Sequence, residues 1–556
     1  MSILHSSSLG SMNALPGSHV KSGGRVTRKL RAGLFNTWTE EYCDSGAEET
    51  TLMSLPEKVL VSIIKLMDEA TILSFAYTCR FIYNIAIPEY IDVSESHEFP
   101  GQLRQFKNWT SRTCLSLSFR HPEHYRCIPL VTLSPAIQSL SDVWFHITPT
   151  RHDMLHQAAR FLQAMSATEN LCISFGSKLP GRLRPVEWEW DALHTCGLVK
   201  ILRALANKRV TRLTLQARGC TTAVAPEHSS TYFFMEDERC YETLESLQDV
   251  YIAVPAMSVP CFRLWMVESL NASPLRSLTL ESRGVPESAW TKLFRSLQLP
   301  SLRHVKLNID SLRARAFSQF LKTNRWVRSL NVQQDLLDED SFMHLRALSY
   351  LEDLTSTAIN VSRVLKNTDA LPCLSQIRIV SRGLRTCPDL LHIAECMAAL
   401  ASWEATRPIK LILDVDQLNH DAEPPQPPLS WTMDEEGNQM ENPELAYFWD
   451  EHANCCAGIS RSIAQAPCLL VRTLEVTLFT GLRFTTSLYY GLKQWLSWCP
   501  SVERLLLSCS TYTEQDAHSL LRTLWKDFPA IQAIEISSGY RRQVHERSHE
   551  TMEVDV

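Results

Sequence analysis

The sequence predicts an α/β protein in which a short three-helix unit precedes an irregular solenoid, with a curved parallel sheet inside and helices outside. Three observations predict this fold. Apolar residues recur at helical spacing near the N-terminus, a short proline-led apolar pattern recurs through the rest of the chain, and helix-like apolar faces separate its copies. At 556 residues, the chain is long enough for such a repeat array.

The first predicted element is the three-helix unit. Ser54 and Glu57 have the spacing of a capping box, which predicts a helix start, and Pro56 falls in its first turn. Three apolar helical faces follow, and we expect Pro88 to end the third helix. The faces comprise Val59, Leu60, Ile63, Leu66 and Met67, then Ile72, Leu73, Ala76 and Cys79, then Ile82, Ile85 and Ala86. So small a unit buries too little apolar surface to be stable alone, so we expect a partner to cover it.

The second predicted element is a repeating strand. Four segments share the template Pro-x-φ-x-x-φ-x-φ, where φ is aliphatic, and they begin at Pro300, Pro372, Pro500 and Pro529. The same core without proline begins at Val210, Leu247, Leu275, Val327 and, in degraded form, Leu351. Successive middle residues are 28, 27, 25, 24 and 23 positions apart, through Val250, Leu278, Val305, Leu330, Leu354 and Ile377. This spacing indicates stacked repeats.

Helix-like faces lie between these strands, as at Trp290, Leu293, Phe294 and Leu297. Alternating strands and helices cannot bury both faces alone, so the units are expected to stack into a solenoid. Over roughly residues 137–537 the chain therefore resembles leucine-rich-repeat proteins. Prolines followed by acidic residues interrupt the pattern at 417–455, which predicts an insertion. A solvated loop and a partner-contacting loop both remain open for it.

Residues 52–86 resemble the F-box, a three-helix module that binds a Skp-type adaptor. The gapless match falls on Leu55, Pro56, Leu60, Ile63, Met67, Ile72, Leu73, Cys79, Arg80 and Ala86. Lys58 and Ile82 stand where the family usually has Glu and an aromatic residue. The resemblance implies adaptor contacts at Leu55, Pro56, Val59, Leu60, Ile63, Ile72, Leu73, Cys79 and Arg80.

Through the adaptor, the resemblance implies attachment to a cullin–RING ubiquitin ligase and a solenoid that holds an unidentified substrate protein. The expected organisation is a disordered segment 1–50, an F-box 51–96, a solenoid 97–540 and a disordered tail 541–556. The alternative is a non-ligase leucine-rich-repeat scaffold with a vestigial F-box.

The candidate substrate contacts follow from strand geometry. Neighbours of the buried strand residues face the other side of the sheet. The concave face is therefore expected to carry Tyr251, Thr279, Lys306, Asn331 and Arg378. Lys306 and Arg378 predict a basic middle, and Glu475 and Glu535 an acidic far end. An ordinary solvated face is one interpretation, and a site for an acidic or phosphorylated substrate segment is the other.

Composition and motifs exclude several other classes. A net charge of −6 gives no positive electrostatic field that would attract nucleic acid. The sequence contains no run of 18 apolar residues, so no membrane span is predicted. Scattered cysteines without a secretory signal favour the cytoplasm or nucleus. Phosphate-binding glycine loops and nucleophile elbows are not found, so neither a cofactor nor enzyme activity is expected.

Two strings resemble metal motifs. HERSH (His545 to His549) matches the zinc-peptidase string HExxH, but it falls in the polar tail predicted to be disordered. HDMLH (His152 to His156) has Asp in place of Glu, and we expect exposed histidines on a helix there. The sequence therefore predicts no metal site.

Overall fold

A computed structural model describes residues between 52 and 547, with its longest gaps at 98–115, 222–242, 334–347, 415–466 and 478–491. The predicted disordered segment 1–50 and the predicted insertion 417–455 lie outside the described residues. The chain divides into two compact units, Met1–Met67 and Asp68–Val556. The division falls inside the predicted F-box, between its first and second helices.

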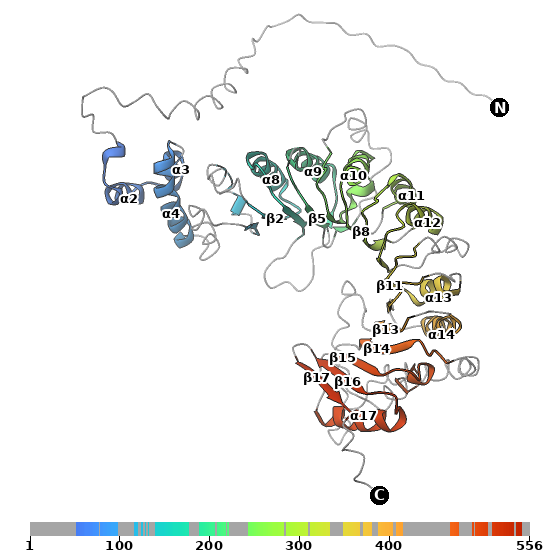
Figure 1. The fold of residues 1–556 in the computed structure, drawn as a ribbon. Helices are drawn as coiled ribbons and strands as arrows, with labels where there is room; N and C mark the ends of the chain where they lie inside the picture. Colours follow the sequence, from blue (N-terminus) through green and yellow to red (C-terminus); the bar gives the residue numbers. More distant parts are fainter. Residues whose placement is uncertain are drawn as a thin grey trace, which may run out of the picture. The chain divides into compact units, whose positions relative to one another are not determined.

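The first unit contains the 3-10 helix η1 (Leu52–Ser54) and helix α2 (Glu57–Lys65) (Figure 1). The predicted capping box is wrong, because Pro56 is the N-cap of α2 and no side chain caps the helix. The extended ψ of 142° at Pro56 stops the helix from starting earlier. Because α2 ends at Lys65, Leu66 lies beyond it and is 89% exposed. Of the predicted buried face only Leu60 is buried, and Ile64, which the prediction did not include, is buried beside it.

The second unit begins with α3 (Glu69–Ala76) and α4 (Arg80–His97). Asp68 Oδ1 accepts the backbone N–H of Thr71 at 2.7 Å, which satisfies one of the free donors at the start of α3. Pro88 does not end the last helix as predicted but lies inside α4. A proline removes one backbone donor, and burial of Tyr90 beyond it helps to offset that loss.

The rest of the second unit is built on one sheet of 15 strands, hydrogen-bonded in chain order. Every neighbouring pair is parallel except the last. The strands are β1 (Ser116–Phe119), β2 (Asp142–Ile147), β3 (Asn170–Phe175), β5 (Arg212–Ala217), β7 (Asp249–Ala253), β8 (Ser277–Ser282), β9 (His304–Ile309), β10 (Ser329–Val332), β11 (Asp353–Ser356), β12 (Gln376–Val380), β13 (Ile409–Asp414), β14 (Val471–Thr477), β15 (Arg504–Cys509), β16 (Ala533–Ser538) and β17 (Arg541–Glu546). A separate two-stranded parallel sheet pairs β4 (Trp188–Glu189) with β6 (Cys220–Thr221).

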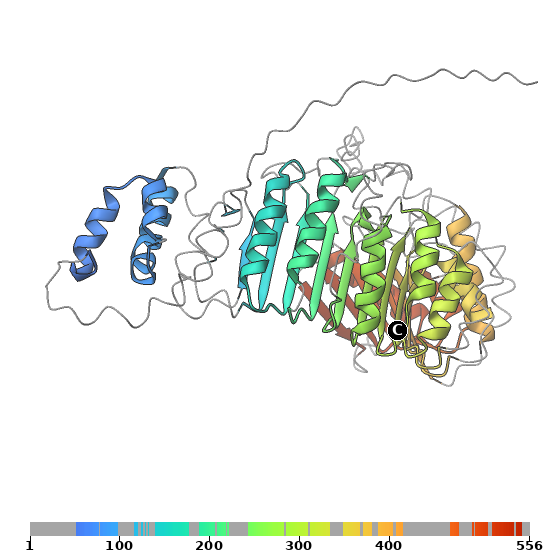
Figure 2. The same ribbon diagram turned by 90° about the horizontal axis from the view of Figure 1, so that it is seen from above.

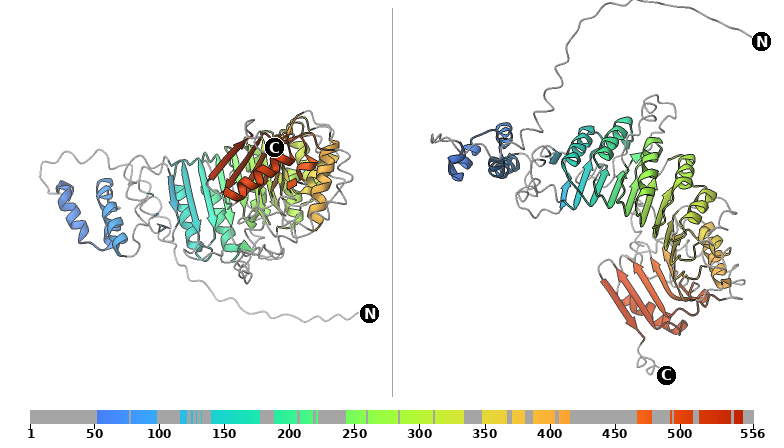
Figure 3. Two further views of the ribbon diagram at one scale, coloured as in Figure 1. Left: turned by 90° about the horizontal axis from the view of Figure 1, so that it is seen from below. Right: turned by 45° about the horizontal axis from the view of Figure 1, so that its top comes forward.

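Helices cover one face of the large sheet (Figure 2). They are α8 (His152–Ala164), α9 (Ala192–Leu205), α10 (Pro260–Ala272), α11 (Glu287–Ser296), α12 (Ala314–Thr323), α13 (Ala358–Lys366), α14 (Cys387–Ser402) and α17 (Glu514–Asp527), with the 3-10 helix η5 (Pro255–Ser258) before α10. Within this unit the sheet curves with its helices on the outer side (Figure 3). We call the opposite face, formed by the strands, the open face.

The predicted repeat register is confirmed. Val250, Leu278, Val305, Leu330, Leu354 and Ile377 are direct partners in adjacent strands. All six are at most 3% exposed, so they form one row of the core under the helices. The predicted helix face of Trp290, Leu293, Phe294 and Leu297 is also buried, at the position of α11. The mostly parallel α/β solenoid therefore follows from the apolar pattern.

The predicted disordered tail is wrong over its first part, because β17 pairs with β16 in antiparallel register. β17 covers the edge that β16 would otherwise expose, and Arg542 forms an ion pair with the buried Glu535. His545 therefore lies in a strand, whereas the peptidase motif needs both histidines on a helix. His549 lies outside the described residues.

Candidate functional site

The open face carries the row of residues predicted to contact substrate. Tyr251, Thr279, Lys306 and Asn331 are direct partners in adjacent strands. Thr355, which belongs to the degraded repeat that begins at Leu351, continues the row from Asn331 to Arg378. All of these residues are partly exposed, so the predicted ladder is continuous. Substrate contact at these residues stays a prediction.

The predicted charge pattern of this face is wrong, because its cations and carboxylates pair with each other. Four pairs join neighbouring strands of the sheet along the diagonal, where long side chains reach each other. They are Lys306–Glu281 (2.7 Å), Arg378–Asp414 (3.4 Å), Lys410–Glu475 (2.6 Å) and Arg504–Glu535 (3.1 Å). The middle is therefore not an uncompensated basic patch, nor is the far end acidic.

Glu535 is the most enclosed carboxylate of these pairs, with a side chain 8% exposed. Its partial burial raises its pKa, but hydrogen bonds from Arg542 and Arg504 outweigh that effect and hold the pKa below its ordinary value. Glu535 is thus a structural link between β15, β16 and β17 rather than a free acidic contact.

A polar strip runs beside the ladder across β9 to β12. His304, Ser329, Asp353 and Gln376 are direct partners along it. Burial and the neighbouring Glu352 raise the pKa of Asp353, with His304 opposing them. Oδ1 of Asn331 is buried without a hydrogen-bond partner among the described residues. This part of the open face offers hydrogen-bonding groups more than net charge.

Sequence reasoning missed one large exposed apolar side chain on the same face. Trp144 of β2 is 52% exposed and stands in the row that leads through Cys172 and Thr214 to Tyr251. The alternation of buried and exposed positions in β2 is the signal that could have found it. An exposed tryptophan is typical of residues that anchor protein interfaces.

The F-box-like residues differ widely in burial. In the first unit, Pro56 and Val59 are exposed, Leu55 and Ile63 are partly exposed, and Leu60 is fully buried. Leu60 was predicted to contact the adaptor, but a side chain without exposed surface supports packing instead.

In the second unit, Ile72 is likewise fully buried, and Cys79 is partly exposed. Ile72 therefore also supports packing rather than the predicted adaptor contact. The side chains of Leu73 and Arg80 lie outside what the structure describes.

Comparisons with known proteins add little to what the structure itself shows. No family model matches the chain, and no curated protein matches it. The chain is similar to a solved structure of the Rad7 and Elc1 complex in yeast, with 10% identity, a TM-score of 0.30 and coverage of 85% of this chain and 96% of that one. It is also similar to the TLR13–ssRNA13 complex, with 10% identity, a TM-score of 0.25 and coverage of 74% and 47%. Likenesses this low carry no argument about function.

Among the described residues, no helix has the length and apolar character needed to cross a membrane.

Proposed function

We propose that this chain is the substrate-recognition subunit of a Skp–cullin–F-box ubiquitin ligase. Residues 52–86 dock on the adaptor, and the open face of the solenoid holds the substrate protein for ubiquitin-dependent degradation in the cytoplasm or nucleus. The subunit performs no chemistry itself. The observation that carries the proposal is the gapless F-box-like pattern from Leu55 to Ala86, placed before an α/β solenoid.

Exposed apolar side chains support an adaptor surface in the first unit. Leu52 is 43% exposed, Val59 is 42% exposed and Leu66 is 89% exposed, all within a few turns of chain. Phe81 of α4 is 42% exposed, beside the motif positions Cys79 and Arg80. The exposed apolar side chains of the first unit support an interaction site there, because water contact disfavours them, and Phe81 adds a separate exposed apolar side chain in the second unit.

The proposal is tested by binding of the full chain to a purified Skp-type adaptor. Val59→Glu places a charge on an exposed interface position, so we expect binding to weaken while the fold persists. Loss of an interface anchor commonly costs about 2 kcal/mol, which is roughly thirtyfold in affinity. Val544→Glu is the matched control, because Val544 is a similarly exposed valine, at 48%, in β17.

The double variant Leu55→Ala with Pro56→Ala gives a second test at the motif itself. We expect it to lose adaptor binding while the melting of the solenoid is unchanged. Absence of adaptor binding by the wild-type chain would instead favour a repeat scaffold with a vestigial F-box, for which Lys58 in place of the usual Glu is the supporting observation.

A further inference from the structure

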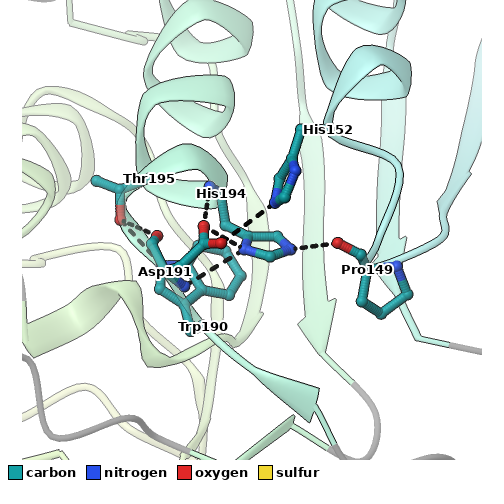
Figure 4. A network of polar contacts seen from close by, with 6 residues as sticks. All are labelled: Pro149, His152, Trp190, Asp191, His194 and Thr195. Atoms are coloured by element: carbon teal, nitrogen blue, oxygen red, sulfur yellow. Dashed lines mark hydrogen bonds and ion pairs between the residues drawn. The ribbon is translucent and has the colours of Figure 1, made fainter.

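Three metal-ligating side chains meet between the first turns of α8 and α9 (Figure 4). They are His152, Asp191 and His194, and one ligand atom from each lies within 4.8 Å of the others. The predicted string HDMLH contains only the first of them. His152 is not simply an exposed helix histidine as predicted, because it turns toward the start of the next helix.

Local structure fixes two of these side chains. Asp191 precedes α9, and its Oδ1 accepts the backbone N–H of His194 at 2.8 Å, as an N-cap does. Further along α9, a Cβ on Gly197 would lie 2.5 Å from Cδ1 of Leu155 in α8. Glycine at this position therefore lets the two helices approach closely, which brings His152 to the cap of α9.

The hydrogen bonds of His194 define which ring nitrogen is available. Nε2 lies 2.9 Å from the carbonyl oxygen of Pro149, which only accepts, so Nε2 carries the proton. In the neutral ring, Nδ1 then has the lone pair, which accepts the backbone N–H of Asp191 at a long 3.3 Å, and Nδ1 also lies 2.7 Å from Oδ1 of Asp191. A backbone carbonyl on the distal nitrogen is the usual support of a metal-bound histidine.

Two electron-rich atoms this close need positive charge, which a proton or a metal ion supplies. A proton on Nδ1 satisfies His194 and Asp191, and Nε2 of His152 then has only Oδ2 of Asp191 near it, at 3.3 Å. That nitrogen has almost no accessible surface and, despite this short distance, makes no hydrogen bond to any residue that the structure describes. A single cation shared by all three side chains would satisfy all of these atoms at once.

The surroundings also fit a buried ligand site. The cluster lies just beyond the carboxyl end of β2, the edge where open α/β sheets bind ligands. The rings of Trp188, Trp190 and Phe175 stand 4.8, 5.4 and 6.4 Å from the ring of His194. This aromatic wall excludes water from one side, while Asp191 remains 47% exposed on another.

We infer that His152, Asp191 and His194 form a site for a divalent transition-metal ion, with zinc as the best-suited ion. Two imidazoles and one carboxylate are typical zinc ligands, at about 2.0–2.1 Å each, so tetrahedral donor atoms lie roughly 3.3 Å apart. The distance from Nε2 of His152 to Oδ2 of Asp191, 3.3 Å, already has this value, whereas Nδ1 of His194 and Oδ1 of Asp191, at 2.7 Å, would move apart when the ion binds. The ion links α8 to α9 and keeps a fourth position for water.

Zinc binding to the full-length protein tests the inference. The protein is treated with chelator, dialysed and titrated with zinc alone, and cobalt absorbance distinguishes nitrogen and oxygen ligands from cysteine thiolates. We expect one zinc ion per chain at this site, and a zinc-dependent rise in melting temperature. His152→Ala and Asp191→Asn should each weaken this binding by at least about a hundredfold.

The variants are chosen to preserve folding. Asparagine caps helices as well as aspartate does, so Asp191→Asn should keep the metal-free melting temperature of the wild type. His156→Ala is the matched control, because His156 is an exposed histidine one turn along the same helix and should leave zinc affinity unchanged.

Failure of the chelator-treated wild type to bind zinc overturns the inference, as does zinc binding by His152→Ala with wild-type affinity. If Asp191→Asn disturbs folding, the zinc affinity of His152→Ala alone tests the inference, because His152 is only half-buried. Neither result bears on adaptor binding, because the cluster lies in α8 and α9.

Discussion

Replacing Leu278 with alanine should loosen the solenoid around β8, whereas replacing its neighbour Thr279 should not. Leu278 is fully buried between Val250 and Val305 in the core row, and Thr279 faces the open side. The leucine-to-alanine change removes three carbons at about 0.8 kcal/mol each, or roughly 2.4 kcal/mol of transfer free energy. The cavity left in a close-packed core brings the expected loss to about 3–4 kcal/mol.

Amide hydrogen exchange is the suitable assay, because a repeat protein of this length need not unfold in one step. Each 1.4 kcal/mol corresponds to a factor of ten, so protection of β8 should fall by roughly a hundredfold or more. Repeat stability is shared between nearest neighbours, so β7 and β9 should lose protection as well. β15 and β16 should keep theirs.

Thr279→Ala is the control, with an expected effect below about 0.5 kcal/mol, as for ordinary surface substitutions. A loss of protection in Thr279→Ala as large as that in Leu278→Ala would contradict the assignment of the two faces of β8. Equal loss at β8 and β15 would refute nearest-neighbour stacking as the source of stability.

Three further changes test other parts of the molecule. Lys306→Glu with Arg378→Glu breaks two open-face ion pairs, each worth at most about 1 kcal/mol, and sets like charges against Glu281 and Asp414. If substrate contacts these strands, its capture should weaken with adaptor binding intact; equal substrate recovery by pull-down would exclude this region. Gly197→Ala should push α9 from α8 and weaken zinc binding, measured by titration, despite its better helix propensity. Burial raises the pKa of Glu535, but the hydrogen bond from Arg542 helps hold this pKa below its ordinary value. The ionised Glu535 therefore stabilises the fold fully above its ordinary pKa, and this stabilisation is lost as pH falls through its lowered pKa in the folded protein. Protection of β17 should therefore fall in acid, and Glu535→Gln, at a cost of roughly 1–3 kcal/mol, should remove most of that pH dependence.

The sequence predicted the solenoid and its register because both depend on local pattern. Each strand places apolar residues at alternate positions, and one face must be buried, so a shift by one residue would expose the whole set. The six residues from Val250 to Ile377 therefore identified direct strand partners without any knowledge of the structure. The helix face around Trp290 followed in the same way from its helical spacing.

Local rules failed where tertiary packing decides the outcome. Pro88 was expected to end a helix, but buried residues on both sides of it keep α4 continuous. The polar composition of residues 541–546 predicted disorder, yet an unpaired edge of β16 and the buried Glu535 make a strand favourable there. Neither the edge nor the buried carboxylate is visible in those six residues.

The side-chain pairs that the sequence analysis missed were missed for a different reason, which is the geometry of a repeat. In a solenoid, equivalent positions of successive repeats are neighbours in space, although they are far apart along the chain. Lys306 pairs with Glu281 one strand back, and His152 meets Asp191 one helix on. The motif HDMLH therefore pairs His152 with His156, whose Nδ1 lies 3.2 Å from Nζ of Lys200 in α9, away from Asp191 and His194. If the repeats are aligned with each other, the first residue of α8 and the cap of α9 fall at nearly equivalent positions, and such positions of adjacent repeats are neighbours in space. The metal-binding inference is tested at these positions.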